Sequence, residues 1–207
     1  MPDTSLESAL RARGLLIIAG VDEAGRGPLA GPVSAAAVIL PLRWRGKGLD
    51  DSKKLSPAKR DECYARITSD ERVAWSVAFA DTDEIDRLNI LRATHAAMAR
   101  AVEGLAKAVD HCLIDGLRVP AFPFPHDGIV KGDGKSLSIA AASIIAKVSR
   151  DRLMTEMAQE FPQYGFERHM GYGTREHLEA LNRHGPCRHH RRSFQPVAQL
   201  SLPFDAS

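Results

Sequence analysis

Hydrophobic positions recur along the chain with two different spacings, one typical of strands and one typical of helices, and together they predict a protein of alternating strands and helices. Residues 72–80 alternate between large apolar and smaller side chains, which is typical of a strand with one face against a core. Other short apolar runs are bounded by glycine, proline or aspartate, as buried strands commonly are. The predicted strands are residues 15–22, 33–40, 72–80, 108–115 and 129–131.

Apolar residues three and four positions apart predict the helices between these strands. Ser56 and Pro57 are a typical N-cap and first helical residue, and Thr4 and Gly14 suit the start and the end of a helix. The predicted helices are residues 5–13, 57–68, 89–107, 138–161 and 174–184. Because strands and helices alternate, we expect an α/β sheet covered by helices.

Length and composition favour one folded unit. The 207 residues, 44% of them hydrophobic, suffice for one sizeable core, with room for a small C-terminal appendage. The net charge of +2 is only mildly basic and does not by itself predict a nucleic-acid partner. Three widely spaced cysteines argue against a disulfide framework, and neither a leader nor a membrane span is visible. We therefore expect a soluble cytoplasmic protein.

Residues 20–29, Gly-Val-Asp-Glu-Ala-Gly-Arg-Gly-Pro-Leu, carry the most chemistry. Asp22 and Glu23 follow an apolar run and precede a Gly-Arg-Gly turn at residues 25–27. Glycines allow backbone N–H groups to approach a ligand closely, and arginine suits a phosphate. The stretch therefore indicates an anionic, phosphate-containing substrate that is handled together with a divalent metal.

Acidic residues recur where predicted strands finish, at Asp22 and Glu23, at Asp115 and at Asp133. Asp22 and Glu23 can serve one site only if their strand ends or bends there, and the glycines at 25–27 supply the bend. Oxygen ligands of this kind favour Mg²⁺ or Mn²⁺ over zinc, and two such ions about 4 Å apart can hydrolyse a phosphodiester. Taken singly, the Asp-Gly pairs at 115 and 133 also suit plain turns.

Three further motifs are weaker evidence for a functional site. Residues 132–136 resemble a phosphate loop, but the glycine that such a loop needs is replaced by Ile129. Residues 187–190 supply at most half of a zinc site. On charge alone, residues 51–54 suit a solvated loop.

The basic run at residues 188–192 has two interpretations. Its three arginines and two histidines could contact phosphates of a nucleic acid. They could equally form a solvated, structural or internally paired segment. We slightly favour the phosphate-contacting interpretation.

From about residue 17 to residue 197 the chain resembles the bacterial ribonucleases HII, the type 2 ribonucleases H. The resemblance rests on residues 20–33, on Asp-Ser-Lys-Lys-Leu at 51–55, and on four later motifs in the same order. These later motifs are Val-Lys-Gly-Asp at 130–133, Ser-Ile-Ala-Ala-Ala-Ser-Ile-Ile-Ala-Lys-Val at 138–148, Gly-Tyr-Gly-Thr at 171–174 and His-His-Arg-Arg-Ser-Phe at 189–194.

This resemblance implies a ribonuclease H-like mixed sheet flanked by helices. Residues 1–207 would form a single catalytic domain, in which about 162–207 are a helical C-terminal segment. It also implies a monomeric, metal-dependent endonuclease that uses two Mg²⁺ or Mn²⁺ ions on RNA/DNA hybrids. Such an enzyme cuts at single ribonucleotides embedded in duplex DNA, on their 5′ side. The cut leaves a 3′-hydroxyl and a 5′-phosphate and starts ribonucleotide removal.

The resemblance also assigns roles by position. The four catalytic and metal-binding carboxylates would be Asp22, Glu23, Asp115 and Asp133. The groups that read the ribose 2′-hydroxyl would be Gly25, Arg26, Gly27 and Tyr172. Residues near the nucleic-acid backbone would be Ser52, Lys53, Lys147 and Arg150. Met170 departs from the pattern, since lysine is common there.

Two other classes of function remain open from the sequence alone. A nucleotide-dependent phosphotransferase would use the glycine-rich loops, and ATP turnover would identify it. A nucleic-acid-binding module without catalysis would lack metal-dependent strand scission, although four intact carboxylates argue against it.

Overall fold

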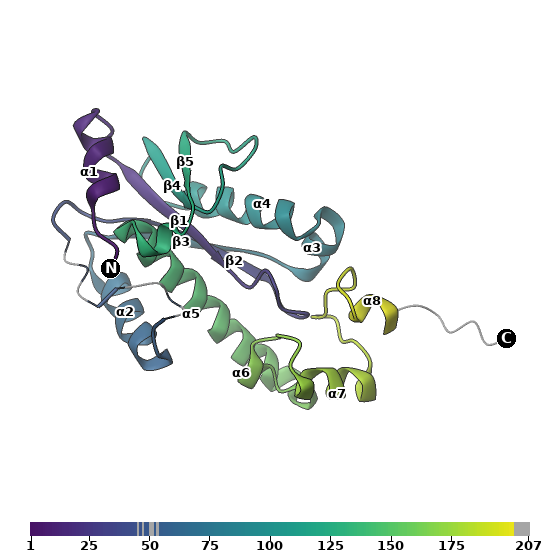
Figure 1. Cartoon of the computed structure of the whole chain (residues 1–207). Coiled ribbons are helices and arrows are strands. Elements are labelled where there is room, and N and C mark those ends of the chain that lie inside the picture. Colours follow the sequence, from purple (N-terminus) through teal and green to yellow (C-terminus); the bar gives the residue numbers. More distant parts are fainter. Residues whose placement is uncertain (45, 47, 50–51, 53, 201–207) are drawn as a thin grey trace.

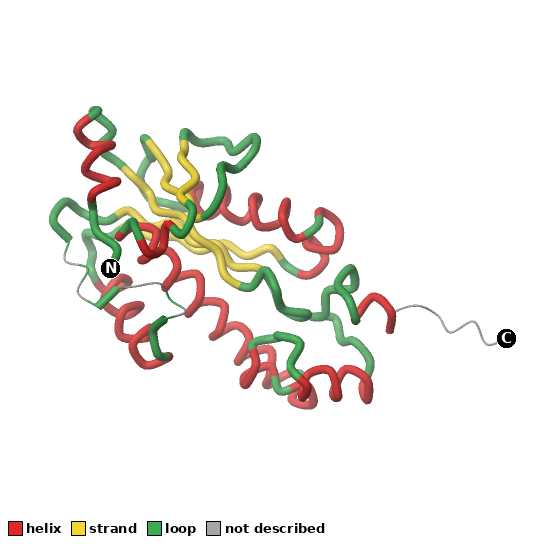
Figure 2. Tube along the Cα trace, in the orientation of Figure 1, coloured by secondary structure: helices red, strands yellow, loops and turns green. Residues whose placement is uncertain are grey.

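A mixed five-stranded sheet forms the centre of the computed structural model, which describes residues 1–44, 46, 48–49, 52 and 54–200 (Figures 1 and 2). The sheet order is β3-β2-β1-β4-β5, in which β2 is antiparallel to β1 and β3, whereas β1, β4 and β5 are parallel. The strands are β1 (Ile18–Ala24), β2 (Val33–Ile39), β3 (Ala74–Ala80), β4 (His111–Asp115) and β5 (His126–Ile129). The predicted mixed sheet flanked by helices is confirmed.

Helices cover both faces of this sheet, with α5 and α2 on one face and α3 and α4 on the other (Figure 1). The long helices are α1 (Ser5–Ala12), α2 (Pro57–Ser69), α4 (Ile90–Glu103), α5 (Leu137–Glu160) and α7 (Arg175–His184). Shorter ones are α3 (Thr82–Leu88), η1 (Gly132–Gly134), η2 (Pro162–Tyr164), α6 (Phe166–His169) and α8 (Val197–Leu200). In the described ranges, no helix combines the length and apolar character needed to cross a membrane.

Small residues bring α5 very close to the central strand β1. A Cβ at Gly20 would lie 2.1 Å from the carbonyl carbon of Ser138, so only glycine allows this approach. On the helix side Ala140, Ala141 and Ala142 are completely buried, because their small side chains allow α5 to pack closely on the sheet. The contact fixes the position of β1, and therefore of its acidic residues, against α5.

Strand pairing decides two boundaries that differ from prediction and affect the acidic residues. β1 continues to Ala24, where β2 still pairs with it, so Asp22 and Glu23 lie inside the strand rather than at a bend. β5 is His126–Ile129 instead of 129–131 because these four residues pair in parallel with β4. Asp133 therefore lies on η1 rather than directly at a strand end.

Helix ends also differ from the prediction. Helix α3 was not predicted, although its N-cap Asp81 accepts a hydrogen bond from the Glu84 N–H. The helix predicted for 89–107 ends at Glu103. Ser56 caps α2 through its hydroxyl as expected, whereas Thr4 precedes α1 without a side-chain capping bond.

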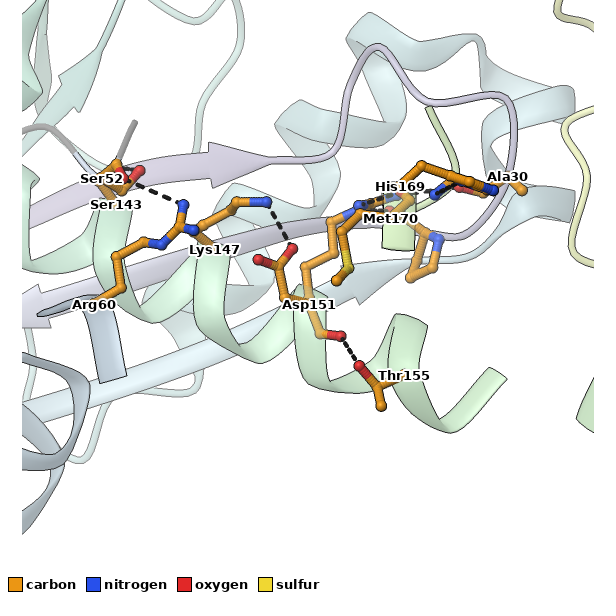
Figure 3. Close-up of polar contacts among 12 residues, drawn as sticks. Ala30, Ser52, Arg60, Ser143, Lys147, Asp151, Thr155, His169 and Met170 are labelled. Atoms are coloured by element: carbon orange, nitrogen blue, oxygen red, sulfur yellow. Dashed lines mark hydrogen bonds and ion pairs between the residues drawn. The ribbon is translucent and has the colours of Figure 1, made fainter. Parts of the chain in front are cut away.

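Two almost completely buried arginines hold the loop at residues 25–32, which joins β1 to β2. Arg150 of α5 is 1% exposed and Arg191, which precedes α8, is 0% exposed. Arg150 donates at 2.9–3.1 Å to the carbonyls of Pro32, Ala30 and Met170. Arg191 donates at 2.5–2.9 Å to the carbonyls of Gly31, Arg26 and Gly25. Figure 3 shows Ala30 and Met170 close together at this contact.

These contacts correct one prediction from the sequence and bear on another. Arg150 was expected near the nucleic-acid backbone; its guanidinium is bonded to three backbone carbonyls inside the protein, and a role toward nucleic acid stays a prediction. The interpretation of residues 188–192 as a phosphate-contacting tail is wrong for Arg191, because it is buried in the same way. Arg188 forms an ion pair with Glu160, whereas the side chain of Arg192 is exposed.

Replacing Arg191 by methionine keeps most of the side-chain volume but removes its N–H donors. We expect Arg191→Met to lower the free energy of unfolding by roughly 2–4 kcal/mol, because three inward-facing carbonyls lose their donors. The matched control Arg192→Met should change it by less than about 0.5 kcal/mol. Urea denaturation at pH 7 measures both values. Equal small losses in the two variants would contradict the proposed role of the buried cation.

Candidate active site

The parallel pairing of β1 with β4 brings three of the predicted acids together. The register ends with Val21 opposite Ile114, so the next residues, Asp22 and Asp115, lie level on neighbouring strands. Glu23 follows on β1, and its side chain is 14% exposed. The carboxyl ends of two parallel strands thus form one acidic edge, as expected for an open α/β sheet.

Asp22 lies at the centre of this edge and is only 5% exposed. Burial raises the pKa of Asp22 well above its ordinary value, and the charges of Glu23 and Asp115 raise it further. Its own strand opposes this shift, since the Glu23 N–H donates to Asp22 Oδ1 at 2.7 Å. The site therefore has an excess of negative charge that a cation would relieve.

Asp115 connects the acidic edge to η1, which carries Asp133. The Gly132 N–H donates to Asp115 Oδ1 at 2.6 Å, and a Cβ at Gly132 would lie 2.6 Å from Ile139 Cδ1. Asp133 itself accepts from the Gly134 N–H at 2.8 Å. Within the described ranges, no three side chains of the types that bind metals lie close enough to enclose an ion together.

The Gly-Arg-Gly turn lies beside these acids and against Tyr172. Gly25 has a φ of +90°, and a Cβ there would lie 1.9 Å from Arg150 Nε, so this position requires glycine. Arg26 Nη1 is 3.1 Å from Glu23 Oε1, which links the turn to the acidic edge. A Cβ at Gly27 would lie 3.7 Å from Tyr172 Cε1, so the ring packs over the glycine. Tyr172 is nevertheless 47% exposed.

A cavity of about 330 Å³ joins Asp22, Glu23 and the 25–27 turn to Tyr172. Its other lining residues are Ala24, Ser52, Ser143, Lys147 and Arg150. On the other side of Glu23 and Arg26 lies a second hollow of about 430 Å³, which also includes Asp115. The pair formed by Glu23 and Arg26 thus stands between two concave surfaces along the acidic edge.

The residues predicted to lie near the nucleic-acid backbone have different environments. Lys147 is 21% exposed and forms an ion pair of 2.7 Å with Asp151, which leaves it at the rim of the site (Figure 3). Ser52 is 4% exposed, and its carbonyl accepts from Arg60 at 3.3 Å. Lys53 lies outside the described residues.

Ser143 is a site residue that sequence reasoning missed. Its hydroxyl donates to Ser52 Oγ at 2.8 Å (Figure 3), and the polar Ser143 side chain beside Asp22 lowers the pKa of that carboxyl. The available signal was a single hydroxyl within an otherwise apolar stretch of α5, at residues 139–146. Ser143 thus connects Asp22 with the loop that carries Ser52.

Comparison with known proteins agrees with this architecture. The family model "Ribonuclease HII" matches residues 19–197. A "Ribonuclease HII" of Ruegeria sp. (strain TM1040) is 54% identical over 200 residues, which cover 96% of this chain and 86% of that protein.

Solved structures show the same fold at lower identity. Ribonuclease H2 from Pyrococcus horikoshii OT3 superposes with a TM-score of 0.74 at 23% identity, over 89% of this chain and 97% of that one. Bst-RNase HIII in complex with Mn²⁺ superposes with a TM-score of 0.67 at 21% identity, over 93% and 72% of the respective chains. Given the family match across residues 19–197, the chain belongs to the ribonuclease HII family, endoribonucleases that act on the RNA of RNA/DNA hybrids.

Proposed function

We propose that this endoribonuclease depends on Mg²⁺ or Mn²⁺ and also cuts at single ribonucleotides embedded in duplex DNA. Cleavage occurs on the 5′ side of the ribonucleotide, leaves a 3′-hydroxyl and a 5′-phosphate, and starts removal of the ribonucleotide. The observation that carries the proposal is the position of Asp22. Burial and the charges of Glu23 and Asp115 all oppose its negative charge, and the turn beside it suits an anion.

The chemistry of the acids fits a pair of hard divalent cations. All donors are carboxylate oxygens, which Mg²⁺ and Mn²⁺ prefer. Asp22, Glu23, Asp115 and Asp133 would hold the ions, which when bound activate a water and stabilise the leaving oxygen. The Mn²⁺ complex of Bst-RNase HIII, a protein of the same fold, is consistent with this assignment.

The protein's own residues position the substrate around these ions. The Gly25 and Gly27 backbone lets a sugar approach closely, and the exposed Tyr172 ring packs on the same turn. A hydroxyl-bearing ring over a backbone turn can sense the ribose 2′-hydroxyl, which distinguishes RNA from DNA without reading sequence. Arg26 and Lys147 supply positive charge at the rim for phosphate groups.

The substrates of this proposal are RNA/DNA hybrids and ribonucleotide-containing duplex DNA, bound by a monomer in the cytoplasm. All three cysteines are free, which suits a reducing compartment. Ser52 and Lys53 remain proposed as residues of the loop that approaches the nucleic acid.

The test of the enzyme class is cleavage of end-labelled duplexes that carry one, four or no ribonucleotides. We expect Mg²⁺- or Mn²⁺-dependent cuts in the first two duplexes and none in the third, with no ATP turnover. Products from the single-ribonucleotide duplex should end in a 3′-hydroxyl on the 5′ side of the ribonucleotide. Binding without scission in either metal would contradict the proposal.

Asp22→Asn separates catalysis from stability. Losing one anionic ligand should slow cleavage by more than about 100-fold in Mg²⁺, while duplex binding persists because repulsion of phosphate falls. The raised pKa of Asp22 means that its charged form destabilises the fold above the ordinary aspartate pKa, so the neutral variant should unfold at a higher temperature at pH 7.

Single-turnover rates, duplex affinity and thermal unfolding measure these effects. Asp83→Asn is the matched control, since Asp83 is an exposed acid at the start of α3 and should leave cleavage unchanged. Near-normal turnover of the Asp22 variant in Mg²⁺ would disprove its role as a ligand.

Tyr172 is tested by a pair of substitutions. Tyr172→Phe removes only the hydroxyl, and Tyr172→Ala also removes the ring that packs on Gly27. Both should slow cutting at a lone ribonucleotide much more than they weaken duplex binding, because the hydroxyl acts on placement in the transition state. Parallel losses of binding and turnover, or no loss at all, would make Tyr172 a purely structural aromatic.

A further inference from the structure

Three buried histidines gather beneath the Tyr172 loop, and none of them belongs to the acidic site. His169 ends α6, His177 lies in the first half of α7, and His190 precedes α8; their exposed fractions are 8%, 0% and 1%. The rings of His169 and His177 stack at 4.6 Å, and His177 is joined to His190 by a hydrogen bond of 3.0 Å between their Nε2 atoms.

The hydrogen-bond partners allow one order of protons along this chain. The Tyr172 carbonyl can only accept, so His177 Nδ1, 2.9 Å away, carries a proton. At the other end the Cys187 N–H donates to His190 Nδ1 at 3.0 Å, so that nitrogen is unprotonated. Neutral His190 therefore has its proton on Nε2 and donates to the unprotonated Nε2 of His177. We call His177 and His190 the histidine relay.

A further proton has no acceptor anywhere in this relay. Protonating His177 would place a second N–H against the Nε2–H of His190. Protonating His190 would place an N–H against the Cys187 N–H, with only the weakly accepting Cys187 Sγ, 3.2 Å away, as another partner. In both cases two donors would face each other in a buried site, which costs the energy of an unsatisfied polar group.

The relay ends on the backbone of the residue that packs on the glycine turn. The Tyr172 carbonyl accepts from His177, and the Tyr172 N–H donates to the His169 carbonyl at 2.9 Å. His190 is followed directly by Arg191, whose guanidinium holds the carbonyls of Gly25 and Arg26. Two adjacent residues thus connect to opposite halves of the candidate ribose-sensing site.

We propose that the neutral histidine relay is a positioning device that sets Tyr172 over the Gly-Arg-Gly turn, and that its protonation releases Tyr172 and slows cleavage at a lone ribonucleotide. The proposal rests on the role of Tyr172 in the proposed function. His177 and His190 act through Tyr172 and do not touch the reacting atoms.

Other titratable groups around the relay come from each element packed against it. They are His169 of α6, Tyr164 of η2, and Cys187 and His189 of the segment before His190. The carboxylates of this region, Glu160 and Glu176, form ion pairs with Arg188 and Arg168. Burial lowers the pKa of His177, and burial together with the charge of His177 lowers the pKa of His190 to about 4.

The sign of the pH effect follows from these directions. Both histidines bind protons more readily in the unfolded chain than in the fold. Their contribution to stability is therefore fully present above the ordinary histidine pKa of about 6.5, and is lost as pH falls toward about 4. Release of Tyr172 requires protonation in the folded protein, so it should occur at the lower end of this window, near pH 4.

A double-mutant cycle tests whether the relay acts through Tyr172. His177→Leu removes the donor to the Tyr172 carbonyl and should reduce the single-turnover rate at a lone ribonucleotide by about 10- to 100-fold, with duplex affinity nearly unchanged. His177→Asn keeps a donor at this position and should restore most of the rate. In the Tyr172→Ala background, His177→Leu should have little further effect.

The outcomes separate this inference from the proposed function. If Tyr172→Ala does not slow cleavage, the proposed role of Tyr172 fails. If Tyr172→Ala slows cleavage but His177→Leu has the same effect in both backgrounds, the relay does not act through Tyr172 and this inference is overturned. His184→Gln, an exposed histidine at the end of α7, is the control and should match the wild type.

Two further measurements decide the matter even if His177→Leu does not fold. Nitrogen-15 NMR of the wild type should show His177 protonated on Nδ1 and His190 on Nε2; the opposite tautomers would overturn the proton order. The amide of His190→Gln can turn to donate or accept, so it avoids the conflict of two donors. Relative to this variant, the wild type should lose thermal stability as pH falls from 7 to 5, and cleavage rate as pH falls further toward about 4. Parallel pH profiles would refute the switch.

Discussion

The candidate site depends on two buried arginine side chains whose charge is solvated by backbone carbonyls of the protein itself. Between β1 and β2 the chain makes a loop whose carbonyls point inward, and Arg150 and Arg191 take the place of water for these groups. A guanidinium suits this task because its N–H donors lie in a rigid plane and reach several acceptors at once. Lysine has the charge but not this geometry.

Arginine and glycine are structurally linked at this loop. Arg150 occupies the space that a side chain at Gly25 would need, since a Cβ there would lie 1.9 Å from Nε. Burial lowers the pKa of Arg150 to about 10 and the pKa of Arg191 to about 9, so both remain charged at neutral pH. The loop is therefore held rigidly, yet its outer surface consists of backbone that a sugar can approach.

The two buried arginines do not offset the negative charge of Asp22, although Arg150 lines the same cavity. Asp22 is influenced mainly by burial and by the negative charges of Glu23 and Asp115. The arginines are bonded to carbonyls and thus leave the acidic edge with its excess charge. This arrangement retains the negative potential that the proposed divalent cations require, while the adjacent turn stays fixed by its own hydrogen bonds.

Local signals in the sequence determined most of the element types, the strand-end position of Asp115, and the family, because propensity, caps and motif order involve residues that are near one another in the chain. Only the tertiary structure decided which cations are buried. The carbonyls that bind Arg191 lie 160–166 positions away, and those of Pro32 and Ala30 lie 118 and 120 positions from Arg150. The same holds for Ser143 beside Ser52 and for the proton order of His177 and His190. Whether a polar side chain binds substrate or the protein's own backbone depends on such distant partners, which no local pattern records.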